Sequence, residues 1–163
     1  MKSYVLSAIV DNNPGVLTRV CQLFNRRGYN LASVTAGVTE NERISRLTLI
    51  ASVENDETVD QIIKQMRKLE DVHKVVLLQE SNSICREIML IKVKAEGNTR
   101  QEIINIVNIF RAAIVDVTPE TLTIEITGDN SKLTAFQGLV EPFGILEVVT
   151  SGFIAIQRGT ESI

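Results

Sequence analysis

The chain has 163 residues and a formal net charge of -3, which argues against general binding to nucleic acid, because that requires clustered Lys and Arg. Hydrophobic residues make up 44% of the sequence and aromatic residues only 4%, so the core must be aliphatic. No apolar run approaches the roughly 20 residues that span a bilayer, and no signal peptide is visible. With two widely separated cysteines, Cys21 and Cys85, we expect a protein of the reducing cytoplasm that has no membrane partner.

The first half of the chain alternates between patterns typical of strands and of helices. In chain order, we expect a strand at residues 4–10, a helix at 14–27, a strand at 31–37, a polar turn at 40–42, a strand at 47–53, a helix at 59–69 and a strand at 72–78. Asn13 suits the N-cap of the first helix and Pro14 its first position, while Gly28 follows the last turn.

The same order of elements returns after a polar linker at residues 79–83. The expected elements are a strand at 88–95, a helix from 99, strands at 113–117 and 122–126, a helix from 131 that ends at 142–144, and a strand at 145–156. Thr99 and Glu102 match a capping box at the start of their helix.

This repeated order predicts an α+β protein of two tandem ferredoxin-like βαββαβ units. The first domain would span residues 1–79 and the second residues 84–163. Each unit would leave one face of its sheet bare and would have edge strands. We therefore expect the chain to form at least a homodimer.

The turn at residues 12–15 is the candidate binding feature. Backbone N–H groups at a helix start attract a carboxylate, and asparagine side chains both donate and accept hydrogen bonds. Asn13 suffices to cap the helix, which leaves Asn12 spare, and Gly15 permits close approach of a ligand. In an edge-paired dimer, Asn30 could lie opposite this turn of the second chain. The pattern favours a pocket for a small zwitterion across that interface; the alternative is turn and cap chemistry alone.

No arrangement of residues typical of catalysis stands out. His73 is the one histidine, and a plain strand-boundary residue is its simpler interpretation. Cys21 lies on the apolar stripe of the first helix, as a core thiol would, and Cys85 lies near the linker. Neither zinc spacing nor a Gly-rich nucleotide loop is present. RNA binding by stacked bases is disfavoured, because the expected strands carry few aromatics. A small enzyme would have to depend on His73.

Blocks of residues along almost the whole chain resemble a known family. They comprise Asn12-Asn13-Pro14-Gly15-Val16-Leu17 and residues 19–20, 23–24, 26–31, 45–48, 86–93, 110–112, 114–118, 127–128, 132–133 and 151–152. The first half resembles an ACT domain. The chain as a whole resembles the regulatory (small) subunits of acetolactate synthase, also called acetohydroxyacid synthase.

The resemblance implies a non-catalytic subunit that activates a catalytic large subunit and confers feedback inhibition by valine or a related branched-chain amino acid. Thiamine diphosphate, Mg and FAD would belong to the catalytic subunit, which condenses pyruvate with a second 2-keto acid, and this chain would bind no cofactor. In the family, effector binding depends on residues that match Asn12, Gly15 and Asn30. The full candidate site is Asn12, Asn13, Pro14, Gly15, Val16, Leu17, Asn30 and Leu31. A free-standing ACT-type sensor, acting on another enzyme or on transcription, is the alternative.

Overall fold

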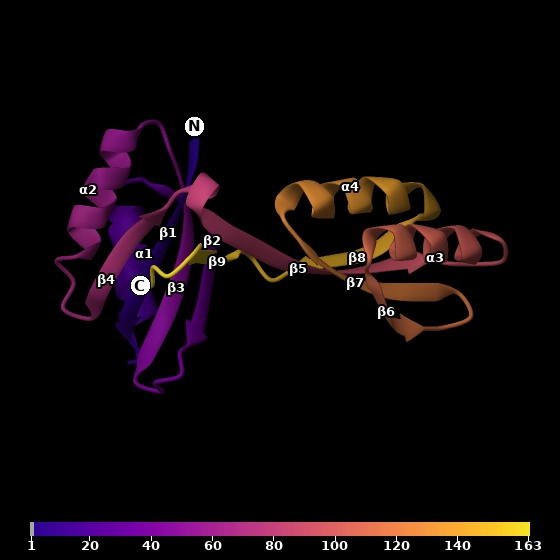
Figure 1. Cartoon of the computed structure of the whole chain (residues 1–163), viewed down its shortest axis with the longest axis horizontal. Helices are drawn as coiled ribbons and strands as arrows, with labels where there is room; N and C mark the ends of the chain where they lie inside the picture. Colours follow the sequence, from indigo (N-terminus) through magenta and orange to yellow (C-terminus); the bar gives the residue numbers. More distant parts are fainter. Residues whose placement is uncertain (1) are drawn as a thin grey trace. The chain divides into compact units, whose positions relative to one another are not determined.

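The structure, a computed structural model, describes residues 2–163 except for the side chain of residue 80. The chain folds into two compact units (Figure 1). Residues 2–85 and 153–163 form the first unit, and residues 86–152 form the second. The change from one unit to the other after residue 85 lies close to the expected boundary. Residues 153–163, which we expected in the second domain, belong instead to the first unit.

The first unit is a four-stranded antiparallel sheet with two helices. Its elements are β1 (Lys2–Asp11), α1 (Val16–Arg26), β2 (Asn30–Val38), β3 (Ile44–Val53), α2 (Asp56–Met66) and β4 (Val72–Leu78). The strand order is β2-β3-β1-β4, so β2 and β4 are the edges. Residues from one face of the sheet, such as Leu6 and Leu49, pack with Phe24 of α1 and Ile62 of α2 in one aliphatic core. These contacts place both helices on one face of the sheet.

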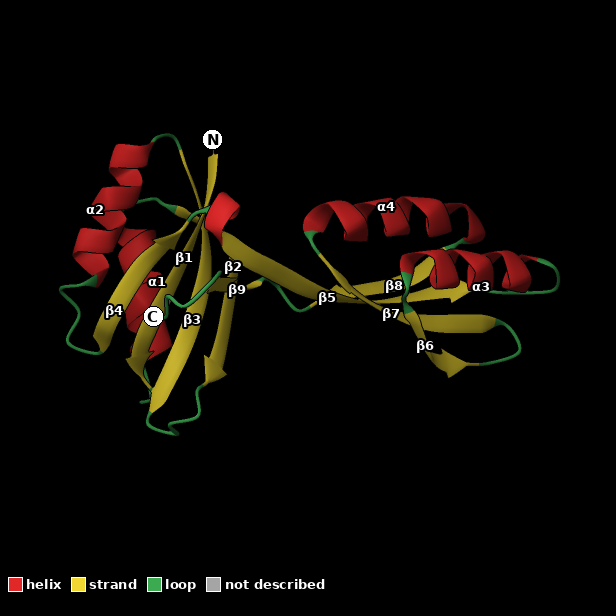
Figure 2. Cartoon of the chain, in the orientation of Figure 1, coloured by secondary structure: helices red, strands yellow, loops and turns green. Residues whose placement is uncertain are grey.

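The second unit repeats this architecture. The remaining elements are η1 (Glu80–Asn82), β5 (Ser83–Lys94), α3 (Thr99–Phe110), β6 (Ala113–Val117), β7 (Thr121–Gly128), α4 (Asn130–Val140), η2 (Glu141–Phe143), β8 (Ile145–Thr150) and β9 (Ile154–Gln157). The strand order β6-β7-β5-β8 matches that of the first sheet, and α3 and α4 lie on the same side of the strands (Figure 2). Phe136 of α4 is fully buried against Phe110 of α3, with ring centroids 5.4 Å apart. The prediction of two ferredoxin-like units is therefore confirmed.

Two local predictions in the second half are wrong. The expected capping box of Thr99 does not form, because the N-cap is Asn98 and the Thr99 hydroxyl donates to the carbonyl of Glu96 (2.7 Å). The strand expected at residues 145–156 is two strands, β8 and β9. Gly152, with a φ of 74°, lies between them, and both strands pair with β5.

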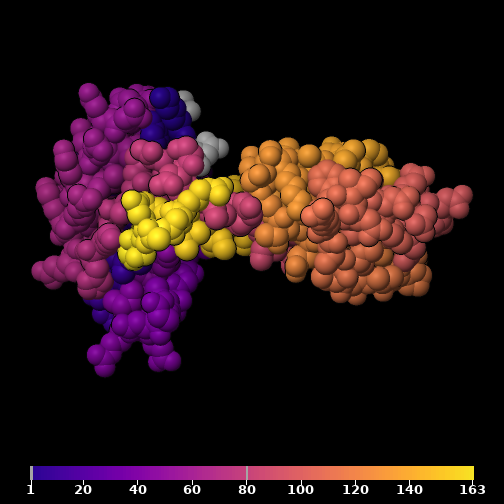
Figure 3. Space-filling view, in the orientation of Figure 1, coloured from indigo at the N-terminus to yellow at the C-terminus, as the bar shows by residue number. Residues whose placement is uncertain are grey.

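The C-terminal segment, residues 153–163, packs on the first unit. Strand β9 pairs with β5, and the backbone N–H of Arg158 donates to the carbonyl of Asn82 (3.0 Å). Figure 3 shows the segment in yellow, lying across the purple and magenta surface of that unit. On the sheet face opposite the helices, Ser7 is 0% exposed and Thr48 is 4% exposed. The expectation of a bare sheet face is therefore wrong for this part of the first unit.

Candidate functional site

The turn before α1 differs from the predicted helix start. The helix begins at Val16, and Gly15 is its N-cap, in the left-handed conformation (φ 87°, ψ −11°). Asn13 is therefore not the cap, and Pro14 lies in the turn, since the positive φ of Gly15 delays the helix. No side chain caps α1 and its first turn carries no acidic residue, whereas the side chain of Asn55 caps α2. The N–H of Val16 donates to the carbonyl of Asn13 (3.3 Å), so the next N–H groups of the first turn, those of Leu17 and Thr18, are the ones available to a carboxylate.

Asn12 is not spare, because its side chain joins the turn to the start of β3. Its Nδ2 donates to the carbonyl of Glu42 (2.8 Å), and its Oδ1 accepts from the hydroxyl of Ser45 (3.0 Å). Its backbone N–H donates to the carbonyl of Arg43 (2.7 Å). A primary amide has two N–H donors and two acceptor lone pairs. One N–H donor and one acceptor lone pair of the Asn12 amide are therefore unused. The side chain is exposed, and its two hydrogen bonds fix its orientation.

Arg19 packs over Gly15 and is held there by an ion pair. Its backbone N–H donates to the carbonyl of Gly15 (2.9 Å), and its Nε donates to Asp71 (2.7 Å). This hydrogen bond lowers the pKa of the Asp71 carboxyl and raises that of the guanidinium. A Cβ at Gly15 would lie 3.1 Å from the Arg19 Nη1. Both this contact and the positive φ favour glycine at this position.

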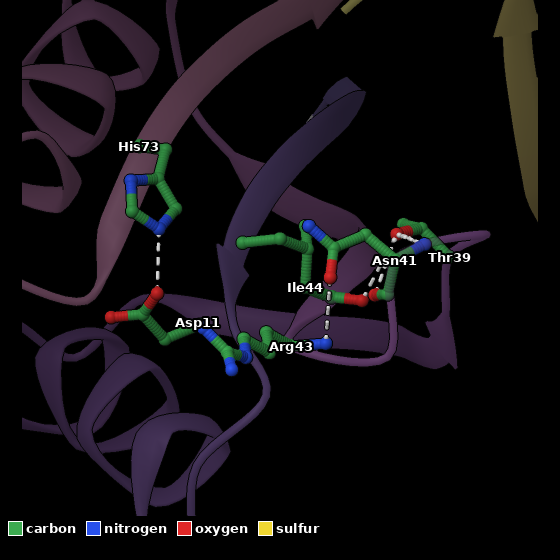
Figure 4. Close-up of polar contacts among 6 residues, drawn as sticks. All are labelled: Asp11, Thr39, Asn41, Arg43, Ile44 and His73. Carbon is green, nitrogen blue, oxygen red and sulfur yellow. Dashed lines mark hydrogen bonds and ion pairs between the residues drawn. The ribbon is translucent and has the colours of Figure 1, made fainter.

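Polar contacts join the ends of β1 and β4 and order the loop before β3 (Figure 4). His73, on β4, forms a 2.6 Å contact with Asp11, the last residue of β1. The backbone N–H of Asp11 donates to the carbonyl of Asp71 (2.8 Å). Before β3, the Asn41 side chain accepts from the backbone N–H of Arg43 (3.0 Å). His73 lies near the start of β4, as expected, and this contact links its exposed side chain to the residue that precedes Asn12.

Asn30 lies far from the Asn12 turn within one chain. Asn30 pairs with Ser52 of β3, whereas Asp11, next to Asn12, pairs with Ile44 of the same strand. These β3 positions are eight residues apart, which corresponds to about 26 Å along a strand. Asn12 and Asn30 of a single chain therefore cannot contact the same amino acid.

Apolar residues surround each end of the candidate site. Val16 is buried in the core, and Leu31 is half-buried against it. Leu17, beside the turn, is 43% exposed. Pro14 and Asn13 are also exposed. The part of the site at the turn therefore offers polar groups next to one exposed aliphatic side chain.

Sequence patterns did not predict a place in this site for three residues that shape it: Arg19, Ser45 and Asp71. Arg19 lies four residues after Gly15, and this helical spacing could have indicated the contact. Ser45 and Asp71 reach the turn only through the pairing of β1 with β3 and β4. No local signal in the sequence marks them.

Cys21 and Cys85 are not joined in a disulfide, and both are half-buried, so Cys21 is less buried than expected. Among residues 2–163, no three His, Cys, Asp or Glu side chains are placed to hold a metal ion. None of the helices in this range is long and apolar enough to cross a membrane.

The fold defines a protein of two tandem ferredoxin-like units, and comparisons with known families assign both units. Residues 6–74 match the family described as AHAS small subunit-like ACT domain. Residues 86–159 match the family described as the small subunit of acetolactate synthase. The two matches cover most of the chain.

Individual relatives agree with these matches over nearly the full length. The chain is 48% identical to the acetolactate synthase small subunit of Mycolicibacterium smegmatis, covering 99% of this chain and 94% of the relative. It is 44% identical to a probable acetolactate synthase small subunit of Archaeoglobus fulgidus, covering 97% and 98%. The crystal structure of the small subunit from Thermotoga maritima superposes with a TM-score of 0.91 at 39% identity, covering 99% and 100%. The chain belongs to the acetolactate synthase small-subunit family.

Proposed function

We propose that this chain is a regulatory subunit that activates the catalytic large subunit of acetolactate synthase and confers feedback inhibition by valine or a related branched-chain amino acid. The observation that carries this proposal is the likeness to acetolactate synthase small subunits over nearly the whole chain. Thiamine diphosphate, Mg and FAD would be bound by the catalytic subunit and not by this chain. Both would function in the cytoplasm.

The start of α1 suits the carboxylate of an amino-acid effector. Its first-turn N–H groups have no side-chain cap, and no acidic residue lies there to repel an anion. The glycine at position 15 leaves the backbone accessible, and the free acceptor position of Asn12 suits the ammonium group. Leu17 offers an exposed aliphatic surface for a branched apolar side chain.

The second asparagine of the site would come from another copy of the chain. Within one chain, about 26 Å separates the β3 positions that pair with the two ends of the site. Strand β2 is an edge of the first sheet, and its Val34 and Val38 are 36% and 58% exposed. An exposed apolar edge strand is suited to pairing with a second edge.

Pairing of two β2 strands brings the two ends of the site together. If two copies pair antiparallel about Val34, Asn30 of one copy lies opposite Val38 of the other. Val38 pairs with Ser45, whose hydroxyl donates to Asn12. The homodimer would therefore hold two effector sites, each with Asn12 and Gly15 from one chain and Asn30 from the other.

The functional assay mixes this chain with the acetolactate synthase catalytic subunit from the same source. Acetolactate formation is measured with and without valine. We expect the chain to raise the rate and valine to reverse the increase. A chain that binds valine but neither associates with nor activates the catalytic subunit would indicate the free-standing sensor instead.

Complementation tests the shared site. Asn12→Ala and Asn30→Ala homodimers should each lose valine binding. In an equal mixture, random exchange of chains restores about a quarter of the sites, because each mixed dimer has one intact site and one doubly altered site. The matched control mixes wild type with the Asn12→Ala/Asn30→Ala chain, whose mixed dimers have no intact site. In this control only the wild-type dimers keep intact sites, so about a quarter of all sites should again bind valine. A site contained within one chain would instead leave none in the first mixture and about half in the control, and that result would refute a site shared between chains.

A further inference from the structure

Arg46 is a half-buried cation on the face of the first sheet that lies opposite the helices. It belongs to β3 and pairs with Ile9 of β1 and Gly37 of β2. Among the described side chains, which leave out that of residue 80, no carboxylate forms an ion pair with it, and burial lowers the pKa of its guanidinium. A buried charge without an ionic partner is costly unless hydrogen bonds satisfy it. Arg46 is not one of the residues of the proposed effector site.

The guanidinium of Arg46 joins the sheet to the C-terminal segment. Its Nε donates to the hydroxyl of Ser7 (3.0 Å), which is fully buried, and its Nη2 donates to the carbonyl of Ala155 in β9 (2.9 Å). A second hydrogen bond between the sheet and the segment is longer: the Lys74 ammonium donates to the carbonyl of Ser162 at 3.2 Å. Arg46 is thus the cation that fixes β9 on β3.

The residue before Arg46 contacts the candidate effector turn. Ser45 donates to the side-chain oxygen of Asn12 (3.0 Å) and is 9% exposed. A displacement of the Asn12 side chain therefore acts on β3 one residue from Arg46. From Ala155 the chain leads back through Gly152 into β8 of the second unit. Beside the direct run of β5 from one unit into the other, this gives a second connection from the turn to the second unit: one hydrogen bond, one peptide unit, one guanidinium contact and the backbone.

We propose that Arg46 is the residue that couples the effector turn to the C-terminal segment, and through that segment to the second unit. This inference rests on the proposed function, since it explains how an effector at the Asn12 turn changes the activity of the catalytic subunit. An effector shifts activity only if it has different affinities for two states, and couplings of about 5- to 150-fold are typical. Without the guanidinium, β9 keeps its pairing with β5 but loses its side-chain contact with β3, so a displacement at the turn is no longer passed from β3 to β9.

The decisive experiment separates effector binding from its effect. Arg46→Ala is made in the full chain, and valine binding to the free small subunit is measured by calorimetry. Activation and the residual activity at saturating valine are measured in the holoenzyme. We expect valine affinity within about threefold of wild type and activation within about twofold, while the inhibition is largely lost. Arg46→Lys, which keeps the charge but not the fork of donors, should restore the inhibition only in part.

A matched control removes an arginine that is not joined to the segment. Arg67 of the same unit also donates to a backbone carbonyl, that of Val75 (3.2 Å). Arg67→Ala should keep both valine binding and full inhibition. If Arg46→Ala does not fold, Arg46→Met in the full chain decides the question, because it keeps an aliphatic stem at this position but has no donor for the Ala155 carbonyl. That variant should bind valine and resist inhibition.

Each result has one interpretation. Full valine inhibition of the Arg46→Ala holoenzyme, or of the Arg46→Met holoenzyme, would overturn the coupling role. Loss of valine binding together with inhibition would also overturn it, because Arg46 would then be a structural part of the effector site. A wild-type protein that neither binds valine nor responds to it would instead refute the proposed function and, with it, this inference.

Discussion

Replacement of Gly15 by alanine tests the conformation of the proposed effector turn, residues 12–15. Gly15 has a φ of 87°, and a left-handed backbone costs a non-glycine residue about 1–2 kcal/mol. The new methyl group would also lie 3.1 Å from the Arg19 Nη1, so the guanidinium must move. A loss of 1 kcal/mol lowers the melting temperature of a domain of this size by about 4–8 °C.

Two other glycines separate the strain from the contact. Gly28 also has a positive φ, of 67°, but a Cβ there meets nothing within 4 Å. Gly37 has neither a positive φ nor a close neighbour. Gly28→Ala should therefore lose about 1–2 kcal/mol, and Gly37→Ala should change stability by less than about 0.5 kcal/mol. Gly15→Ala should lose more than Gly28→Ala, and the excess should disappear in an Arg19→Ala background.

Thermal unfolding and valine calorimetry on the same three variants complete the test. Gly15→Ala should weaken valine binding at least tenfold, or about 1.4 kcal/mol, because the methyl group occupies the approach to the first N–H groups of α1. Gly28→Ala should bind valine as wild type does. If Gly15→Ala is as stable as Gly37→Ala, or if Gly28→Ala loses valine binding equally, the reasoning about this turn is wrong.

Three further predictions concern stability. The hydrogen bond from Arg19 lowers the pKa of Asp71. The stabilisation from this ion pair is therefore complete above about pH 5 and is lost as the pH falls through the folded-state pKa of Asp71. The difference in melting temperature between wild type and Asp71→Asn should decline from pH 5 to pH 3, and a constant difference would contradict this. Asn55 caps α2 with its side chain whereas Asn98 makes no such bond at α3, so urea unfolding should show a loss of about 0.5–2 kcal/mol for Asn55→Ala and almost none for Asn98→Ala. Phe136 is fully buried, so Phe136→Ala should cost the second unit about 3–5 kcal/mol, and a smaller loss in denaturant unfolding would indicate that the core collapses around the cavity.

The sequence predicted the elements whose signals are local. Alternation of Leu122, Ile124 and Ile126 with polar residues specifies β7 and its buried face, and the structure buries all three. The first helix start was wrong because Asn13, Pro14 and Gly15 each fit a helix N-terminus by local rules. Only the backbone conformation of Gly15 decides among these alternatives.

Contacts between distant segments could not be predicted in the same way. The C-terminal segment pairs with β5 and packs on the first unit, although its sequence continues the strand pattern of the second. Nothing in the alternation of β9 indicates that this strand pairs with β5 while its segment packs on the first unit. The carbonyl of Ala155 that Arg46 binds is a backbone group, which carries no sequence signature at all.

Asn12 was expected to be spare, but its side chain is held in place, and this fixed orientation favours its proposed role in effector binding. A spare asparagine would be free to rotate, and binding an effector would then require its side chain to be ordered, which costs about 0.5–1.5 kcal/mol. In the structure, Glu42 and Ser45 already fix the amide and use only half of its hydrogen-bonding capacity. The remaining donor and acceptor are thus oriented before any ligand arrives. The same two contacts also make β3 sensitive to the ligand, because an effector that pulls on Asn12 pulls on the strand that carries Arg46.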